Sequence, residues 1–514
     1  MIVLVHNDDT VVSIKKLLNN EPIVVKSSSV IETIFQLSNE YNDFIIWVHQ
    51  REESNLNLSQ LSTIFHHKKI VASFSENDYL KKEVGFVHDS SPNVNINKKV
   101  SYATWFITST VGGIHSEIIS KLDYFIYKKD SFNYFLHSIA LLGMYNESLF
   151  CYSEPNLLKA KASIVINQAS NYELFKFVKQ HQHIKWTFFL LLNFIVHKRE
   201  FLFFSFLFSF LSKKRKFECG VFDSVKVQST LAIESVFDLD VIIPTIGRKN
   251  YLHNVLKDFS NQTLLPKKII IVEQNQLQNS ISELQYIYEE SWPFEIVLIF
   301  THQIGACNAR NIALTKTTSN WVFLADDDNR FEPNLITKIF KNIKKFGCNS
   351  VTTSYLQKNE KQVLNKVLQW PTFGAGNSFV KRKYLKTMQF DLRLEFGYGE
   401  DTDFGMQLRN KGVDIIYLPD PNILHLKAPI GGFRTKPVLA WDSESMQPKP
   451  SPTIMLFALL HKTDEQIKGY KLRLFLKTYS EQKKLNPFSY FNNMKKQWKL
   501  SVYWANYLKN KFKE

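Results

Sequence analysis

An apolar segment that ends in three consecutive aspartates constrains this chain more than any other feature. Residues 321–325 read WVFLA, and Asp326, Asp327 and Asp328 follow directly. The apolar run is typical of a buried strand, and three adjacent carboxylates repel one another unless a cation or polar ligand offsets their charge. Carboxylates are the ligands that Mg²⁺ or Mn²⁺ prefers, and such a metal keeps coordination positions open for a diphosphate. A solvated acidic turn is the alternative interpretation.

The segment 321–325 is the fourth strand of an α/β series. Strands are expected at DLDVIIPT (238–245), KKIIIVEQN (267–275) and EIVLIFTH (295–302), each followed by a helix. This alternation predicts a mostly parallel sheet with helices on both faces. Ligands of such sheets bind beyond the carboxyl ends of the strands, which is where the three aspartates stand.

Other polar residues fall at the same edge of the predicted sheet. The first strand ends in Pro-Thr-Ile-Gly-Arg (244–248), so Arg248 could pair with a phosphate or contact a base. Glu273, after the second strand, could hydrogen-bond a nucleobase or ribose. A helix begins at GACNARNIAL (305–314), where Arg310 could approach a diphosphate while backbone amides favour anions. Each of these residues could instead be an ordinary surface residue.

Two motifs further along the chain complete the candidate site. FGAGNSFVKRKYL (373–385) reads as a glycine-rich loop that leads into a strand and a helix. EFGYGEDTDFGMQLRNKG (395–412) places Glu400 and Asp401 in the first turn of an amphipathic helix. The helix dipole stabilises carboxylates there, so capping explains at least one of them. The same turn can present one acid to a ligand cleft, which is the position that a general base needs.

The segment ILHLKAPIGGFR (423–434) follows a later strand and adds two candidates. His425 could be a metal ligand or support one, although a lone histidine after a strand is more often structural. Arg434 could contact a phosphate from a closing loop.

Taken in order, DLDVIIPTIGR, the Ala-Asp-Asp-Asp-Asn run at 325–329, GAGNSF and GEDTDF resemble the family 2 glycosyltransferases, over about residues 238–435. The resemblance implies a GT-A fold, which is a Rossmann-like nucleotide-sugar-binding architecture, and inversion at the anomeric carbon. It also implies Mg²⁺ or Mn²⁺ as cofactor and a nucleoside-diphosphate sugar as donor, with a UDP-sugar the foremost candidate. Within this family, the chain resembles the bacterial enzymes that build surface polysaccharides.

The resemblance also implies roles for individual residues. Asp326 and Asp327 would contact the nucleoside and ribose, and Asp401 would be the base, with Glu400 as the contender. The candidate metal ligands are Asp328, Asp326 and His425. The candidate donor-binding residues are Pro244, Thr245, Arg248, Glu273, Arg310, Asp326, Asp327, Gly376 and Asn377.

At 514 residues the chain exceeds what one hydrophobic core usually organises. We expect an α/β domain at 1–155, a helical and partly very apolar linker at 156–236, the catalytic domain at 237–440, and basic amphipathic helices at 441–514. The net charge of +16 implies an acidic partner. The four cysteines form no CxxC pair and the first residues lack a signal-peptide pattern, so a cytoplasmic location is expected.

Two apolar bursts in the linker, at 186–196 and 201–211, raise the question of a membrane. Each burst is only ~16 Å long as a helix against a ~30 Å hydrocarbon core, so neither crosses alone. Joining them would place Lys198, Arg199 and Glu200 near the middle of the bilayer. A helical pair on an anionic membrane surface, on its inner face, is favoured over a hairpin packed on protein. The basic, aromatic C-terminal helices suit the same surface.

The first domain reads as a degenerate copy of the catalytic one. Residues 132–135, with Ile139 and Gly143, repeat the spacing of the Asp401–Phe404 segment with Leu408 and Gly412, and Glu-Pro at 154–155 echoes Asp-Pro at 420–421. In this alignment the triplet position holds His49, Gln50 and Arg51, and the base position holds Phe132. We therefore expect a GT-A-like domain without catalytic carboxylates. The neighbouring Glu52 and Glu53 leave open an active first domain whose acidic residues are shifted along the chain. Chance periodicity shared by α/β domains is the alternative.

The favoured function is an inverting glycosyltransferase that modifies a glycan or lipid-linked acceptor, with a homo-oligomer left open. The main alternative is a non-catalytic carbohydrate-binding or scaffolding protein, against which the intact Asp328 and Asp401 argue. A sugar-phosphate nucleotidyltransferase would need a glycine-rich loop after the first strand, and residues 244–248 are too poor in glycine. Nucleic-acid binding is not expected, because no zinc pattern or RNA-binding motif is present.

Overall fold

The computed structural model describes residues 1–89, 95–232, 238–429, 438–481 and 486–511, and Arg434 lies outside them. The chain divides into two compact units. The first comprises 1–232 with 345–347 and 463–472, and the second comprises 233–344, 348–462 and 473–514. Residues 156–232, which we predicted to be a separate linker, therefore pack with the first unit. The predicted C-terminal region is shared between the units.

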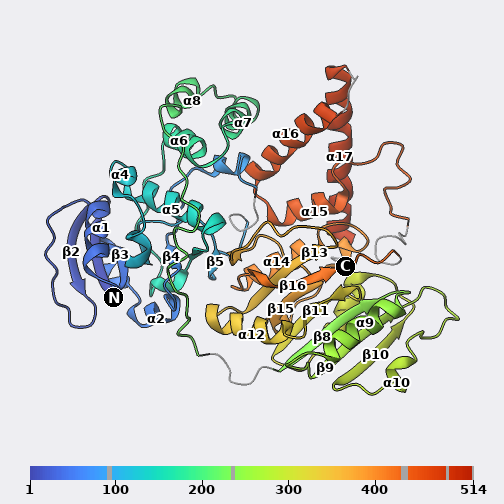
Figure 1. The fold of residues 1–514 in the computed structure, drawn as a ribbon. Coiled ribbons are helices and arrows are strands. Elements are labelled where there is room, and N and C mark those ends of the chain that lie inside the picture. Colours follow the sequence, from blue (N-terminus) through green and yellow to red (C-terminus); the bar gives the residue numbers. More distant parts are fainter. Residues whose placement is uncertain (90–94, 233–237, 430–437, 482–485, 512–514) are drawn as a thin grey trace. The chain divides into compact units, whose positions relative to one another are not determined.

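The first unit contains a mixed sheet of seven strands in the order β2-β1-β3-β6-β4-β7-β5 (Figure 1). Strands β1 and β3 run parallel, β6 runs antiparallel to both β3 and β4, and β4 and β7 run parallel. The strands are β1 (Ile2–Asn7), β2 (Thr10–Lys16), β3 (Phe44–His49), β4 (Ile70–Phe74), β5 (Tyr102–Ala103), β6 (Val111–His115) and β7 (Phe150–Ser153).

Helices of the first unit cover this sheet, because their apolar side chains pack against the apolar side chains of its strands. Trp47 of β3, Ile34 of α1 and Phe135 of α5 belong to one buried cluster, and Phe175 of α6 extends that cluster outward. The helices are α1 (Val30–Glu40), α2 (Leu61–Ile64), α3 (Ser116–Ile119), α4 (Tyr124–Tyr127), α5 (Phe132–Asn146), α6 (Asn171–His181), α7 (Lys185–Asn193) and α8 (Phe203–Ser209).

The second unit contains a larger sheet in the order β10-β9-β8-β11-β15-β13-β16-β12, with β14 also paired to β16. Strands β10, β9, β8 and β11 are parallel, as expected, whereas β15 runs antiparallel to β11 and β13, so the sheet is mixed. The strands are β8 (Leu239–Thr245), β9 (Lys268–Gln274), β10 (Glu295–Thr301), β11 (Trp321–Ala325), β12 (Asn329–Arg330), β13 (Ser350–Gln357), β14 (Leu368–Gln369), β15 (Asn377–Lys381) and β16 (Ile416–His425).

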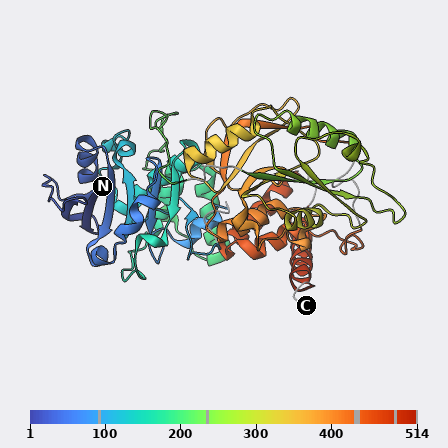
Figure 2. The same ribbon diagram turned by 90° about the horizontal axis from the view of Figure 1, so that it is seen from below.

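Alternate residues of β11 face opposite layers of helices in the second unit. Phe323 contacts Phe259 of α9, with ring centroids 6.0 Å apart, while Val322 and Leu324 belong to the core beneath α11 and α14. Figure 2 shows helices on both faces of this sheet, which confirms the predicted α/β class. The helices are α9 (Lys249–Ser260), α10 (Tyr286–Glu289), α11 (Ala306–Thr315), α12 (Leu335–Phe346), α13 (Arg382–Leu385), α14 (Glu400–Asn410), α15 (Pro452–His461), α16 (Asp464–Glu481) and α17 (Pro487–Lys511).

The two sheets share one strand connectivity. Strands β1, β3, β6, β4 and β7 adjoin in the same order and relative directions as β8, β11, β15, β13 and β16, and β5 pairs with β7 as β14 pairs with β16. Among the described residues the sheets differ in two places: the antiparallel β2 stands beyond the first strand in place of the parallel β9 and β10, and β12 has no counterpart in the first sheet. The first unit therefore lacks the part of the sheet that leads into α11.

Candidate active site

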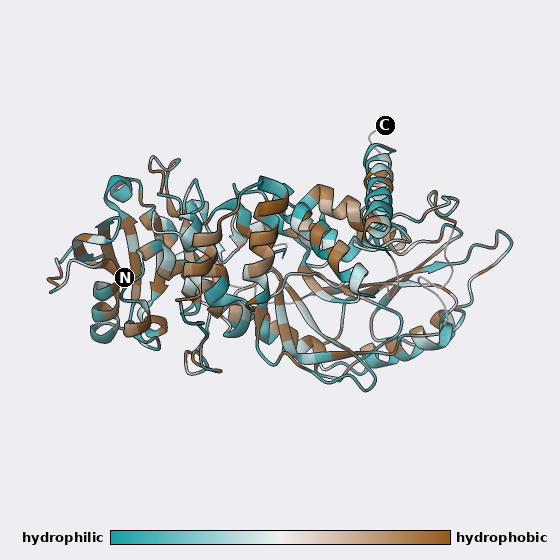
Figure 3. Ribbon diagram, turned by 90° about the horizontal axis from the view of Figure 1, so that it is seen from above, coloured by the Kyte–Doolittle hydropathy of each residue, from teal (hydrophilic) through white to brown (hydrophobic). Residues whose placement is uncertain are grey.

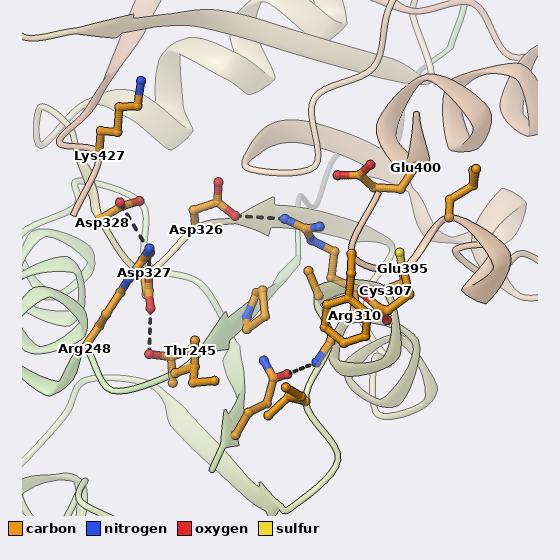
Figure 4. Close-up of a pocket in the computed structure, with 18 of the residues that line it drawn as sticks. Thr245, Arg248, Cys307, Arg310, Asp326, Asp327, Asp328, Glu395, Glu400 and Lys427 are labelled. Carbon is orange, nitrogen blue, oxygen red and sulfur yellow. Dashed lines mark hydrogen bonds and ion pairs between the residues drawn. The ribbon is translucent and has the colours of Figure 1, made fainter. Parts of the chain in front are cut away.

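A cavity of about 390 Å³ opens at the carboxyl ends of β8 and β11 in the second unit. The strand polarity accounts for its position, because polar loops leave parallel strands at that edge. Figure 4 shows carboxylates and guanidinium groups that converge on it. It is lined by Pro244, Thr245, Ile246, Arg248, Gln274, Ile304, Gly305, Ala306, Cys307, Arg310, Asp326, Asp327, Asp328, Leu394, Glu395, Phe396, Glu400, His425 and Lys427.

Asp327 ties the ends of β8 and β11 together. Its Oδ2 accepts a hydrogen bond from Thr245 Oγ1 at 2.7 Å, and its Oδ1 accepts from Arg248 Nη1 at 2.7 Å. Burial raises the pKa of Asp327 to about 6, and the nearby Arg248 and Thr245 limit the rise. Both oxygens of this carboxylate therefore accept hydrogen bonds, and one of these bonds holds Arg248 at the cavity.

Asp326 is held from both sides. Its Oδ1 accepts from Arg310 Nη2 at 3.0 Å, and its Oδ2 accepts from the Tyr355 hydroxyl at 3.0 Å. Gly376 lies directly beneath, and a Cβ at that position would stand 2.1 Å from Asp326 Oδ2. The glycine therefore permits the carboxylate to take this position, which explains one glycine of the GAGNSF motif.

Asp326, Asp328 and His425 bring one ligand atom each within 4.8 Å of one another. The antiparallel pairing of Asn329 with His425 delivers the histidine to the aspartates. Asp328 Oδ1 is buried and has no hydrogen-bond partner among the described residues, and His425 Nε2 lies 3.5 Å from it. Two carboxylates and an imidazole suit Mn²⁺ or a similar divalent cation, so the donor set fits such an ion.

The ionisation of these groups also suits a cation. Burial opposes charge on Asp328, but His425, the Ala428 amide and Arg248 outweigh it and leave the pKa of this carboxyl lowered. The Ala428 N–H donates to Asp328 Oδ2 at 2.8 Å. An ionised carboxylate with one oxygen fixed by backbone keeps its other oxygen available as a ligand.

Residues 240–406, which carry nearly all of this arrangement, match the family model described as glycosyl transferase family 2. This segment is similar in sequence to the family 2 glycosyltransferases. The match confirms the resemblance read from the motifs, and with it the predicted GT-A fold of this segment.

Two curated relatives share segments of 106 residues with the chain. An uncharacterized glycosyltransferase of Haemophilus influenzae is 27% identical, over 21% of this chain and 34% of the relative. The uncharacterized glycosyltransferase YwdF of Bacillus subtilis is 31% identical, over 21% of this chain and 38% of the relative. The chain therefore spans little more than a third of the length of the curated relatives it matches.

Two solved structures have a partial likeness to this chain. One is S. aureus TarS 1–349 in complex with UDP-GlcNAc, with a TM-score of 0.32 and 15% identity, over 50% of this chain and 70% of that chain. The other is GalNAc-T7 with UDP, GalNAc and Mn²⁺, with a TM-score of 0.31 and 13% identity, over 38% of this chain and 44% of that chain.

The two acids at the start of α14 have different surroundings in the glycosyltransferase domain. Glu400 lines the cavity, whereas the Asp401 Oδ2 accepts from the Ala375 N–H at 3.2 Å and its Oδ1 is buried without a hydrogen-bond partner among the described residues. Burial and the neighbouring Asp401 raise the pKa of Glu400 to about 7. Burial also raises the pKa of Asp401, against the opposing charge of Arg310. Two acids with raised pKa values are thus adjacent in the sequence, and Glu400 is the one that lines the cavity.

Two amides at the amino terminus of α11, which we expected to attract a diphosphate, donate to a carboxylate of the protein itself. Glu395 Oε1 accepts from the Cys307 N–H at 3.0 Å, and its Oε2 accepts from the Asn308 N–H at 2.8 Å. The positive end of the helix dipole attracts an anion, and the protein supplies its own carboxylate. Arg310, one turn further on, still faces the cavity as predicted.

Three predicted donor-binding residues lie outside the cavity lining. Glu273 is buried within β9, where its Oε1 accepts from the Glu283 N–H at 2.9 Å. Gly376 lies under Asp326, and Asn377 Nδ2 donates to the Thr353 carbonyl at 2.6 Å. In this structure Gly376 and Asn377 support the site from beneath.

Several residues of the site were not predicted from the sequence. Tyr355 stacks on His425 with ring centroids 4.6 Å apart, but in the sequence it is one aromatic residue within an ordinary strand. Glu395 caps α11 from a distant loop, and no local signal connects the two segments. Lys427 lines the cavity two residues after His425, and a basic residue after the histidine was the one hint available.

The equivalent position in the first unit has a different chemistry. Phe44 pairs with His115 and Val48 with Val111, as Trp321 pairs with Lys381 and Ala325 with Asn377. When the strands are aligned on these pairs, His49, Gln50 and Arg51 take the positions that the three aspartates occupy in the second unit. The sequence spacing had indicated the same three residues.

The base position of the first unit differs from our expectation by one residue. Asn133 Oδ1 accepts from the Ser109 N–H at 2.9 Å, in the manner in which Asp401 accepts from Ala375. Asn133, and not Phe132, is thus the counterpart of Asp401. Each of these residues is the second residue of its helix. The capping residue sets where a helix starts, whereas the spacing of apolar residues further along the helix does not.

Aromatic side chains fill the space at these strand ends in the first unit. The His6 ring lies edge-on to those of His49 and Phe132, with centroid distances of 5.6 Å and 5.4 Å. Burial lowers the pKa of His6 to about 4, so the ring is neutral at physiological pH. This cluster is a packed core, and within the part of the chain that the structure describes no group of potential metal ligands gathers there.

Proposed function

We propose that this protein is an inverting glycosyltransferase that moves a sugar from a nucleoside-diphosphate sugar to a hydroxyl of a glycan or lipid-linked acceptor. The observation that carries the proposal is the convergence of three aspartates, two arginines and Glu400 on one cavity at the carboxyl ends of β8 and β11. The family match to residues 240–406 supports it. A UDP-sugar donor, a cytoplasmic location and a role in surface-polysaccharide synthesis form part of the same proposal.

In this proposal the arginines bind the diphosphate of the donor. Arg248 and Arg310 both line the cavity and are each paired with an aspartate, which fixes their direction. Asp326, Asp328 and His425 would hold the divalent cation, which when bound neutralises charge on the leaving diphosphate.

Asp401 is the proposed general base, which takes the proton of the acceptor hydroxyl as that hydroxyl attacks the anomeric carbon. One of its oxygens is fixed by the Ala375 amide, and the other has no hydrogen-bond partner within the described part of the chain. Glu400, whose pKa is raised to about 7, lies beside it at the cavity wall and is the competing candidate. Attack opposite the leaving group would convert an α-linked donor into a β-glycoside.

We further propose that the first unit is a GT-A-like copy that performs no sugar transfer. Its shared strand connectivity supports common architecture, and Gln50, Arg51 and Asn133 at the key positions supply neither a metal site nor a carboxylate base. Assembly or acceptor binding is the role we assign to it.

The test measures hydrolysis and transfer from a panel of nucleotide sugars with Mn²⁺. We expect the variants Asp328→Ala and Asp401→Asn to lose at least about a hundredfold in kcat, and Asn133→Ala, the matched change in the first unit, to keep wild-type activity. Equal activity in all of the variants removes the site assignment. Nucleotide-sugar binding without turnover by the wild type favours the carbohydrate-binding alternative.

A further inference from the structure

Helices α7 and α8 carry an apolar surface that their own unit leaves uncovered. They form the layer beyond α6, on the side away from the sheet (Figure 1). Their inward side is buried, since Phe194 and Phe206 pack on Phe175 of α6 with ring centroids 5.8 Å and 6.2 Å apart. The hairpin is therefore firmly attached to the first unit through one face.

The outward side of the same hairpin is apolar as well. In Figure 3, which looks onto this end of the unit, both helices are largely brown. We call this surface the hairpin face; its members are between 40% and 80% exposed and are Phe188, Ile195, Val196, Phe201, Phe203, Phe204, Leu207, Phe208 and Leu211. Single exposed apolar residues are ordinary, but nine between residues 188 and 211 mark an interaction surface.

Basic residues flank the hairpin face along the chain. Exposed cations occur before α7, between the helices and after α8, and they are Lys185, Arg199, Lys213, Lys214 and Lys216. Two further cations are paired within the unit, Lys198 with Glu83 and Arg215 with Asp130, and Glu200 is the one acid between 185 and 216. A second copy of this face would bring like charges together, whereas anionic lipid headgroups complement them.

The dimensions of the hairpin fit a location in the plane of the membrane surface. α7 and α8 contain nine and seven residues. Their lengths of roughly 14 Å and 10 Å are far below the ~30 Å of a hydrocarbon core. Among the described residues no helix is long and apolar enough to cross a bilayer.

We propose that the hairpin face docks the protein on an anionic lipid surface. The phenylalanine and leucine side chains enter the boundary between headgroups and acyl chains, and the flanking lysines and arginine contact lipid phosphates. The proposal is independent of the reaction proposed above, because the hairpin contributes no residue to the cavity.

The experiment is co-sedimentation of the full chain with vesicles. One set contains phosphatidylcholine alone, and the other contains equal parts of phosphatidylcholine and phosphatidylglycerol. We expect the wild type to sediment with the anionic vesicles, to bind neutral ones far less, and to be partly released by added salt. Phe204→Glu/Phe208→Glu should bind at least about tenfold more weakly, because both residues lie on the hairpin face.

Two further variants keep the result interpretable. Leu18→Glu/Val24→Glu changes two residues of the first unit that are 98% and 94% exposed but lie outside the hairpin face, and it should bind as the wild type does. Lys213→Gln/Lys214→Gln leaves the apolar residues in place and should lose the preference for anionic vesicles. Donor hydrolysis in solution should stay unchanged in all three variants, which separates membrane docking from catalysis and from misfolding.

Three outcomes overturn the proposal. The first is a wild type that stays in the supernatant with anionic vesicles, and the second is a Phe204→Glu/Phe208→Glu variant that sediments as the wild type does. The third is a dimer in sedimentation equilibrium that this variant abolishes while vesicle binding is absent, since a second copy of the chain would then cover the hairpin face.

Discussion

Arg310 Nη2 lies 3.0 Å from Asp326 Oδ1, and this ion pair connects α11 with the end of β11 at the centre of the cavity. The guanidinium also stands between Asp326 and Glu400 (Figure 4). Its charge lowers the pKa of both Glu400 and Asp401 against the rise that burial produces. One residue thus positions a candidate metal ligand and adjusts the candidate base pair.

Transfer activity should therefore depend on pH near neutrality. The pKa of Glu400 is raised to about 7 and that of Asp401 is raised as well, mainly by burial, and the base must be ionised to accept a proton. We expect kcat/KM to fall as the pH drops through about 7 and to reach a plateau above it. The measurement is a pH–rate profile of the wild type with saturating Mn²⁺. A flat profile between pH 5 and 9 contradicts the role of this acid pair.

Arg310→Gln should shift that profile toward higher pH. Without the guanidinium, the attraction that favours the charged carboxylates is lost, so the apparent pKa of the profile should rise. The rate on the plateau should also fall by roughly a hundredfold, because a phosphate-binding and Asp326-positioning group is lost. Arg382→Gln, a matched change at an arginine that does not line the cavity, is the control. An unchanged midpoint in Arg310→Gln would show that the arginine does not act on the base pair.

Glu400 should also make stability depend on pH. Its carboxyl binds a proton more tightly in the folded chain than in the unfolded chain, so the folded state holds the extra proton between pH 4.5 and about 7. A rising pH therefore lowers the free energy of unfolding across that window. Glu400→Gln removes the effect and should be more stable than the wild type at pH 8, by on the order of 2 kcal/mol, but not at pH 4.5. Thermal midpoints at the two pH values measure the difference, and equal midpoints at pH 8 oppose the assignment.

The sequence was sufficient to place the parts of the site that depend on strand polarity. Asp326, Asp327 and Arg248 stand at the carboxyl ends of neighbouring parallel strands, and a strand followed by a polar loop is visible in one dimension. The α/β class of both units and the position of α14 follow from the same periodic patterns.

The parts that the sequence left open depend on contacts between distant segments. His425 reaches Asp328 because β16 pairs antiparallel with β12, and no local pattern near residue 425 specifies that register. Glu395 closes the amino terminus of α11 from a loop 88 residues further on. Asn133 was missed by one residue because the spacing was aligned on apolar positions and a glycine further along each helix, and these do not fix where the first turn begins.

Gly376→Ala should displace Asp326 without unfolding the domain. A Cβ at residue 376 would stand 2.1 Å from Asp326 Oδ2 and 2.9 Å from the Tyr355 hydroxyl, so that carboxylate must move. We expect at least a tenfold loss of kcat and a destabilisation of about 1–3 kcal/mol, measured by steady-state kinetics and thermal unfolding. Tyr355→Phe, which removes the hydroxyl but keeps the ring on His425, should show a smaller loss. Wild-type activity in Gly376→Ala would mean that the position of Asp326 is unimportant.

His425→Ala should weaken metal binding more than it weakens binding of the donor. The imidazole is the one neutral donor of the Asp326–Asp328–His425 group, and its loss leaves two carboxylates to hold the ion. The Mn²⁺ concentration needed for half-maximal activity should rise about 10- to 100-fold, and the rise in thermal midpoint caused by Mn²⁺ alone should shrink. His302→Ala removes a histidine at the end of β10 whose ring faces the Asn275 carbonyl, and it should respond to Mn²⁺ as the wild type does. If His425→Ala keeps the wild-type dependence on Mn²⁺ in both measurements, the histidine is not a ligand and its stacking on Tyr355 is its whole contribution.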